Sequence, residues 1–298
     1  MDNKISRSEL FGLEIILLYG NFAATKYILT MGSFAFFSLI CLIVCEFVFI
    51  SIASFIPPIK SSLFGFALSL LPLFAISILT FDEAKSLQKG DYSYVNIWII
   101  VLTSLLFCIY LSLKGIAFVG RSAIIFSMIG GVCVVILLAV YVKTLNFSRL
   151  ISGYKNYDGF YKVLFSFIPE LILIYLCKSF FYLEKPNRIT NAPAEKSLTR
   201  KELNVVFFKS STKAWAVSSV LRLAVTFCLL SLADSRIYAL SPDMSIFAAR
   251  LLKSTTLSPV ISAGIYMLTL LRFCTALCVL ITFFKSGLCC KKLNYEKS

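Results

Sequence analysis

The chain has 298 residues, of which 59% are hydrophobic and only 15% are charged, and its mean hydropathy is +0.87. A soluble domain of this length cannot bury so much apolar surface, so the composition predicts a protein whose solvent is the bilayer. The net charge of +14 is spread over the hydrophilic segments rather than gathered in one domain. This distribution argues against nucleic-acid binding and fits segments that lie next to anionic lipid.

The first apolar segment, Leu10–Thr25, is too short to cross a bilayer as an ideal helix. It contains the carboxylate of Glu14 and is interrupted by Gly20-Asn21, where the glycine allows the backbone to unwind. Unwound backbone leaves helix ends that can hold the charged groups of a solute. The alternative is a kinked packing helix in which Gly20 admits a neighbouring helix closely.

Four longer apolar segments follow, and each is long enough to span a bilayer. They are Ser33–Phe55, Ser61–Phe81, Val95–Leu113 and Ala123–Val142. Gly130-Gly131 predict close helix packing in the last of them. Glu46 lies inside the first, and we expect it to pair with Arg121 or Lys178, because isolated charges are rarely tolerated at this depth.

The next apolar segment, Val163–Cys177, is also short and is interrupted by Pro169. Proline removes a backbone donor and clashes with the preceding turn, so we expect the helix to break there. Glu170 would then lie in the first turn of the second half, where it either binds a solute ammonium or pairs with Arg222 or Arg272. Two short, interrupted spans in corresponding places predict a transporter-type binding site between them.

Two further apolar segments, Ala214–Ala233 and Gly264–Phe284, bring the prediction to about eight spans. Residues 184–213 form a basic segment, predicted to be a cytoplasmic loop that is either flexible or contains a surface helix. Residues 234–259 are predicted to form an outer loop. Because segments rich in lysine and arginine stay in the cytoplasm, both termini are predicted to be cytoplasmic.

The sequence contains no recognisable catalytic or metal-binding motif. It has no histidine, no P-loop and no HExxH motif. Eight of its ten cysteines lie inside apolar segments, where they behave as small hydrophobic residues. Cys289 and Cys290 follow the last apolar segment without a second cysteine pair, which disfavours a zinc site. We therefore expect no enzymatic activity, no cofactor and no metal.

The two interrupted spans predict an amphoteric pocket, in which backbone N–H groups hold a carboxylate and Glu170 holds an ammonium. The expected ligand contacts are Gly20, Asn21, Ser166, Phe167, Pro169 and Glu170. The residues expected to form charge pairs within the membrane are Glu14, Glu46, Arg121, Arg222 and Arg272.

Several short motifs occur in an order that resembles the GerAB-type spore germination proteins. These are the B subunits of germinant receptors, within the amino acid–polyamine–organocation transporter superfamily. The motifs are Ile5–Leu10 before the glycine-broken first span, Lys114-Gly115 and Arg121 at the fifth span, Phe165–Leu173 in the sixth, and Ala249–Leu252 before the last.

This resemblance implies an all-α polytopic membrane protein of transporter type, with discontinuous first and sixth spans. The family has ten spans in a five-plus-five inverted repeat, so the eight predicted here would form an incomplete repeat. The resemblance also implies a sensor in the inner spore membrane, which binds a small nutrient such as an amino acid together with A and C receptor subunits. The alternatives are a secondary amino-acid transporter and a scaffold or degenerate paralogue that binds no solute.

Overall fold

The computed structural model describes residues 5–19, 28, 31, 34–59, 61–89, 92–141, 160–181, 200–232 and 257–295. Within these ranges the regular structure is helical, apart from one backbone bridge between Ile5 and Phe181. The helices are α1 (Arg7–Tyr19), α3 (Ala35–Phe55), α4 (Ser62–Lys89), α5 (Ile97–Lys114), α6 (Ile116–Tyr141), α8 (Phe160–Lys178), α9 (Arg200–Leu232) and α12 (Leu257–Tyr295). The protein is thus all-α.

Four of the described helices are long and apolar enough to cross a membrane: α3, α4, α5 and the Pro259–Ser286 part of α12. Large apolar side chains such as Leu63, Phe74 and Trp98 are more than half exposed on α4 and α5. In water such a surface would be unfavourable, whereas in a bilayer it faces lipid of the same polarity. The exposed faces therefore identify the sides of the bundle that contact the membrane.

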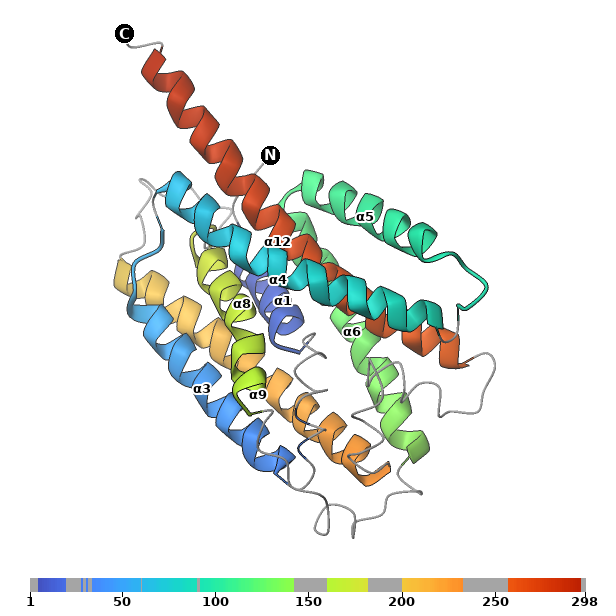
Figure 1. Cartoon of the computed structure of the whole chain (residues 1–298). Helices are drawn as coiled ribbons and strands as arrows, with labels where there is room; N and C mark the ends of the chain where they lie inside the picture. Colours follow the sequence, from blue (N-terminus) through green and yellow to red (C-terminus); the bar gives the residue numbers. More distant parts are fainter. Residues whose placement is uncertain are drawn as a thin grey trace, which may run out of the picture.

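Helix α1 forms the interior of the bundle. Every residue from Gly12 to Tyr19 is buried, and the helix contacts both α6 and α9. Around it, α3 lies beside α9, and α12 runs along α4 before its C-terminal part extends beyond the other helices (Figure 1). The segment before α1 is held by the N–H of Ile5, which donates to the carbonyl oxygen of Phe180 at 2.9 Å.

The close packing of α1 against α6 depends on Gly12 and Gly120, which approach the facing backbone where a larger residue would collide. The sequence pointed instead to Gly130-Gly131 as the packing site. The described residues give no such packing at Gly131, because apart from the backbone of its own helix no described atom lies within 4 Å of the place where its Cβ would be. A glycine pattern reports which residues are small, but only the helix crossing decides which of them are needed.

Two helices begin well before the apolar segments that predicted them. Helix α6 begins at Ile116, and α9 begins at Arg200, inside the predicted basic loop 184–213. In the first part of α9, Phe207 and Ser211 are buried while Lys209 and Lys213 are exposed. This alternation is that of an amphipathic helix, whose polar face lowers the mean hydropathy that was used to find the spans. Residues 234–256 of the predicted outer loop lie outside the described residues.

The predicted break at Pro169 is absent, because α8 is helical from Phe160 to Lys178 with Pro169 inside it. Proline removes only one intrahelical donor, and helices packed within a membrane tolerate it where neighbours surround the backbone. Pro169 is itself buried. The first interrupted span is described only as far as Tyr19, the last residue of α1, so the break at Gly20-Asn21 stays a prediction. Gly20 and Asn21 lie outside the described residues.

Candidate functional site

Glu46 of α3 and Arg222 of α9 form an ion pair in the interior, with 0% and 4% of their side chains exposed. Arg222 Nη1 donates to Glu46 Oε1 at 2.6 Å, and Nη2 donates to Oε2. The guanidinium therefore satisfies both carboxylate oxygens, as its planar geometry allows. The expected partners of Glu46, Arg121 and Lys178, are both engaged elsewhere, so that prediction is wrong.

A second ion pair joins Glu170 of α8 to Arg272 of α12, and both side chains are 0% exposed. Arg272 Nη2 donates to Glu170 Oε1. Glu170 Oε2 has no hydrogen-bond partner among the described residues. The pair is one of the two that the sequence allowed for Glu170, and it differs from the Glu46 pair because one carboxylate oxygen is left without a donor.

The two ion pairs form one group, which we call the charge cluster: Glu46, Arg222, Glu170 and Arg272. Phe167, three residues before Glu170 on α8, places its ring centroid 5.2 Å from the guanidinium carbon of Arg222. The Glu46 and Glu170 carboxylates are close enough to interact electrostatically. Four helices thus bring two acidic and two basic groups together with no net charge, around an aromatic ring that is 1% exposed.

Lys178 lies at the end of α8 and holds the end of α3 rather than an acidic residue. Its Nζ donates to the carbonyl oxygens of Ala53, Ser54 and Ile56, at 3.0, 2.7 and 2.7 Å. The last carbonyls of a helix have no intrahelical donor and carry the negative end of the helix dipole. A buried ammonium satisfies several of them at once.

Glu14 of α1 is fully buried, and the hydroxyl of Ser211 on α9 donates to its Oε1. The sequence predicted a charged partner for Glu14. In the described part of the chain no basic side chain forms an ion pair with it, and its Oε2 has no hydrogen-bond partner. The contact with Ser211 was not foreseen, because a serine near an apolar span has no signal that separates it from ordinary helix residues.

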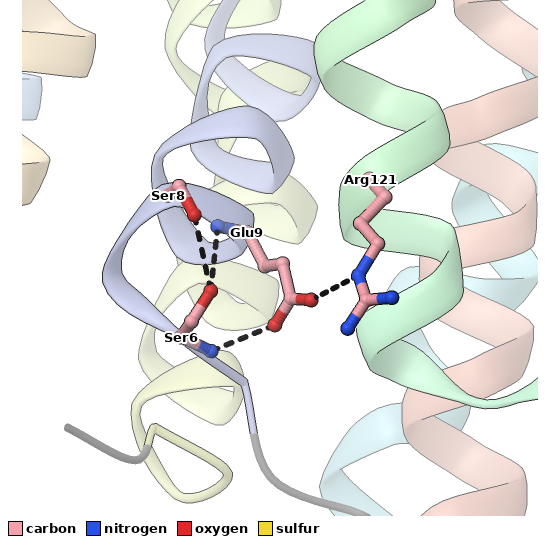
Figure 2. A network of polar contacts seen from close by, with 4 residues as sticks. All are labelled: Ser6, Ser8, Glu9 and Arg121. Atoms are coloured by element: carbon pink, nitrogen blue, oxygen red, sulfur yellow. Dashed lines mark hydrogen bonds and ion pairs between the residues drawn. The ribbon is translucent and has the colours of Figure 1, made fainter. Parts of the chain in front are cut away.

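Glu9 links the start of α1 to α6 (Figure 2). Its Oε2 accepts from the Ser6 N–H at 2.7 Å, while its own N–H donates to Ser6 Oγ at 3.4 Å. Its Oε1 accepts from Arg121 Nε at 2.6 Å, and the Arg121 side chain is 71% exposed. Ser6 and Glu9 have the spacing of a helix capping box, a sequence signal that could have identified Glu9 but was not used above. Arg121 thus pairs with Glu9 from the outer surface of the bundle, and its place within the membrane stays a prediction.

The predicted ligand contacts can be placed only in part. Phe167, Pro169 and Glu170 are buried on α8, and Ser166 is partly buried next to them. Of this set, Glu170 is a member of the charge cluster, and Phe167 contacts the cluster through Arg222. Gly20 and Asn21 would complete the pocket from the first span, and they lie outside the described residues.

A separate cavity of about 160 Å³ lies between α4, α5 and α12. Its lining is mainly apolar, and the hydroxyls of Ser104 and Tyr266 contact each other across it at 3.0 Å. None of the predicted site residues lines it. Several lining residues, such as Phe81 and Leu105, are also exposed on the membrane-facing surface, so this cavity is not part of the charge cluster.

No protein-family model matches the chain, and no curated protein matches it. Among solved structures, the chain is similar to Mhp1, a nucleobase-cation-symport-1 family transporter in a closed conformation with bromovinylhydantoin bound. The similarity covers 96% of this chain and 68% of Mhp1, with a TM-score of 0.59 and 12% sequence identity. At this identity the likeness shows the fold alone. The chain is an integral membrane protein with a transporter-like fold.

Proposed function

We propose that this chain binds a small zwitterionic solute, such as an amino acid, at the Glu170–Arg272 pair. The observation that carries the proposal is a difference in hydrogen bonding between the two acidic groups of the charge cluster, Glu46 and Glu170. Both oxygens of Glu46 accept from Arg222, whereas Oε2 of Glu170 has no partner among the described residues. A buried, ionised oxygen without a hydrogen-bond donor is unfavourable. A solute ammonium at Glu170 would supply that donor.

A zwitterion also fits the charge balance of the site. The charge cluster holds two acidic and two basic groups, and a solute with one charge of each sign leaves this balance unchanged. The planar guanidinium of Arg272 matches a carboxylate, and Glu170 matches an ammonium. In this proposal the backbone after the predicted break at Gly20 and Asn21 in the first span adds N–H groups, and Ser166, Phe167 and Pro169 line the α8 side. Glu46 and Arg222 have a structural role.

For the biological role, the motif resemblance supports a GerAB-type germinant receptor subunit. In that role the protein lies in the inner membrane of a spore, with both termini in the cytoplasm, and signals through A and C subunits. The basic segment 184–213 then contacts anionic lipid or an acidic partner surface.

The likeness in fold to Mhp1 favours a second candidate, a secondary transporter that moves its solute with a coupled ion. A scaffold that binds no solute is the third reading.

The binding site is tested by Glu170→Gln, with Glu46→Gln as the matched control. Both changes remove one buried carboxylate charge at nearly constant shape. A panel of amino acids is added to the purified protein, and binding is measured as the shift in unfolding temperature. We expect Glu170→Gln to weaken binding by roughly ten- to a hundred-fold, because a charge-assisted hydrogen bond contributes about 1.5–3 kcal/mol. Glu46→Gln should lower stability but retain the affinity of the molecules that fold.

The proposal is wrong if Glu170→Gln binds the same solute as tightly as the unmodified protein, per folded molecule. It is also wrong if no amino acid shifts the unfolding temperature of the unmodified protein. The two roles are separated by uptake of the labelled solute into proteoliposomes. Concentrative uptake favours the transporter, and binding without uptake favours the receptor subunit.

A further inference from the structure

Glu14 is a buried acidic group that the proposed solute site does not use. Its side chain is 0% exposed, and the residues one helical turn away on both sides, Leu10, Leu17 and Leu18, are also 0% exposed. One oxygen accepts from Ser211, and the other has no partner among the described residues. An ionised carboxylate is poorly accommodated by one hydroxyl in an apolar setting, whereas a protonated carboxyl is neutral.

The groups that face Glu14 offer no compensating charge. Of the helices packed against α1, α9 contributes the Ser211 hydroxyl, and α8 contributes the Cys177 thiol, which interacts with Glu14 electrostatically. Cys278 of α12 interacts in turn with Cys177. The other charged groups described on these helices are engaged or exposed. Glu9 pairs with Arg121, Arg272 with Glu170 and Arg222 with Glu46, and Lys178 donates to the carbonyl oxygens at the end of α3. Those that are exposed are Glu202, Lys209 and Lys213 on α9 and Lys285 on α12.

We propose that Glu14 is a proton-binding site that holds its proton while α1 packs against α9 and releases it when the two helices separate. On release, the O–H bond of the carboxyl breaks, its electron pair remains on the carboxylate, and water accepts the proton. A metal cation such as sodium fits less well, because it requires several oxygen ligands and the only hydrogen-bond partner of the Glu14 carboxyl among the described residues is the Ser211 hydroxyl. The proton would be the ion coupled to solute movement, and this last step alone rests on the transporter candidate of the proposed function.

The protonation state is tested by infrared spectroscopy on the purified, solute-free protein, so the result does not depend on any solute being found. Protonated and ionised carboxyls absorb in different regions. At about pH 7, where exposed carboxyls are ionised, the difference spectrum between the unmodified protein and Glu14→Gln should show loss of one protonated carboxyl band. Loss of an ionised carboxylate band instead would overturn the proposal.

Two further variants make the assignment independent of how Glu14→Gln folds. Ser211→Ala removes the hydroxyl bonded to Glu14, so it should shift the same band, and an unchanged band would belong to another carboxyl. Asp82→Asn is the matched control, because Asp82 is a carboxyl with 64% of its side chain exposed. Asp82→Asn should leave the protonated band unchanged. Loss of the band in this variant would show that the band does not belong to Glu14 and would overturn the assignment.

The link to helix separation is tested through Cys177, which is buried on α8 and interacts electrostatically with Glu14. Glutamine at position 14 imitates the protonated state permanently. With a thiol-specific reagent at about pH 9, where accessible thiols are largely ionised, Cys177 should react several-fold faster in the unmodified protein than in Glu14→Gln. Cys108, buried between α5 and α12, should react equally in both. Equal Cys177 rates would overturn the link between proton release and opening of the site.

Discussion

The contact between α1 and α6 depends on single glycines. A Cβ at Gly12 would lie 2.5 Å from Ile124 Cγ1 and 2.8 Å from the carbonyl oxygen of Gly120. A Cβ at Gly120 would lie 2.8 Å from the Cβ of Glu9. Side chains can rotate away from such contacts, but a backbone carbonyl within a helix cannot. Small residues therefore set the distance between these two helices, as is common in membrane proteins.

We expect Gly12→Ala to reduce the free energy of unfolding by about 1–3 kcal/mol, the usual effect of overpacking. Gly131→Ala is the control, because no described atom lies within 4 Å of its added Cβ. It should leave stability unchanged or raise it by about 0.5–1 kcal/mol, since alanine favours a helix over glycine. Unfolding in detergent measures both variants. Equal destabilisation by both would show that the α1–α6 contact is looser than described.

Glu46 and Arg222 show how a buried ion pair depends on both partners. Glu46→Met or Arg222→Met leaves one buried charge without its partner, and each should destabilise the protein by about 3–5 kcal/mol. The double variant removes both charges and should recover most of that loss, because apolar residues often replace a buried pair without penalty. A double-mutant cycle of unfolding free energies checks this. Additive losses in the double variant would mean that the two residues do not act as a pair.

At the scale of the helices, the end of α3 is held by a side chain of another helix. The carbonyl oxygens of Ala53 and Ser54 in its last turn, and that of Ile56 directly after it, accept from Lys178 of α8. The Lys178 Nζ also lies 5.2 Å from the ring centroid of Phe207 on α9. A helix that ends against Pro57 and Pro58 has no following N–H groups from those residues to satisfy its carbonyls. The ammonium thus joins α3, α8 and α9 at one point.

Lys178→Met should lower the free energy of unfolding by at least about 1.5–3 kcal/mol, because buried carbonyls lose hydrogen bonds to a charged donor. Amide exchange should increase first in the last turn of α3. Lys85→Met is the control, since Lys85 forms an exposed pair with Asp82 at 3.8 Å. Its effect should stay within about 0.5 kcal/mol. A similar small effect at Lys178 would show that water already satisfies these carbonyls.

For the whole molecule, the distribution of lysine and arginine predicts the orientation in the membrane. The basic segment 184–213 is expected on the cytoplasmic side, and residues 234–259 on the outer side. A fluorescent reporter fused after Ser298 should be active in the cytoplasm, and a periplasm-specific reporter inserted near residue 245 should be active outside. The reverse pattern would overturn the predicted topology. If the reporter after Ser298 lies on the outer side while the N-terminus is cytoplasmic, the number of spans is odd.

The sequence by itself determined the class of protein and the middle of each span. Hydropathy is a local property, so the apolar segments around Leu42, Leu102 and Leu270 could be found without knowing what they pack against. It also showed which charges lie in apolar surroundings, because Glu14, Glu46 and Glu170 stand inside such segments. The first residues of α6 and α9 were less predictable, since amphipathic turns resemble loops in hydropathy.

Only the tertiary structure decided which group each charge meets. Glu46 bonds to a residue 176 positions away, and Glu170 to one 102 positions away. Those pairings depend on how α3, α8, α9 and α12 cross, and many crossings are compatible with the same hydropathy pattern. For the same reason Glu14 was assigned a charged partner and meets the Ser211 hydroxyl instead. Pro169 remains inside a helix because the packing around α8, and not its own sequence, determines whether the backbone breaks.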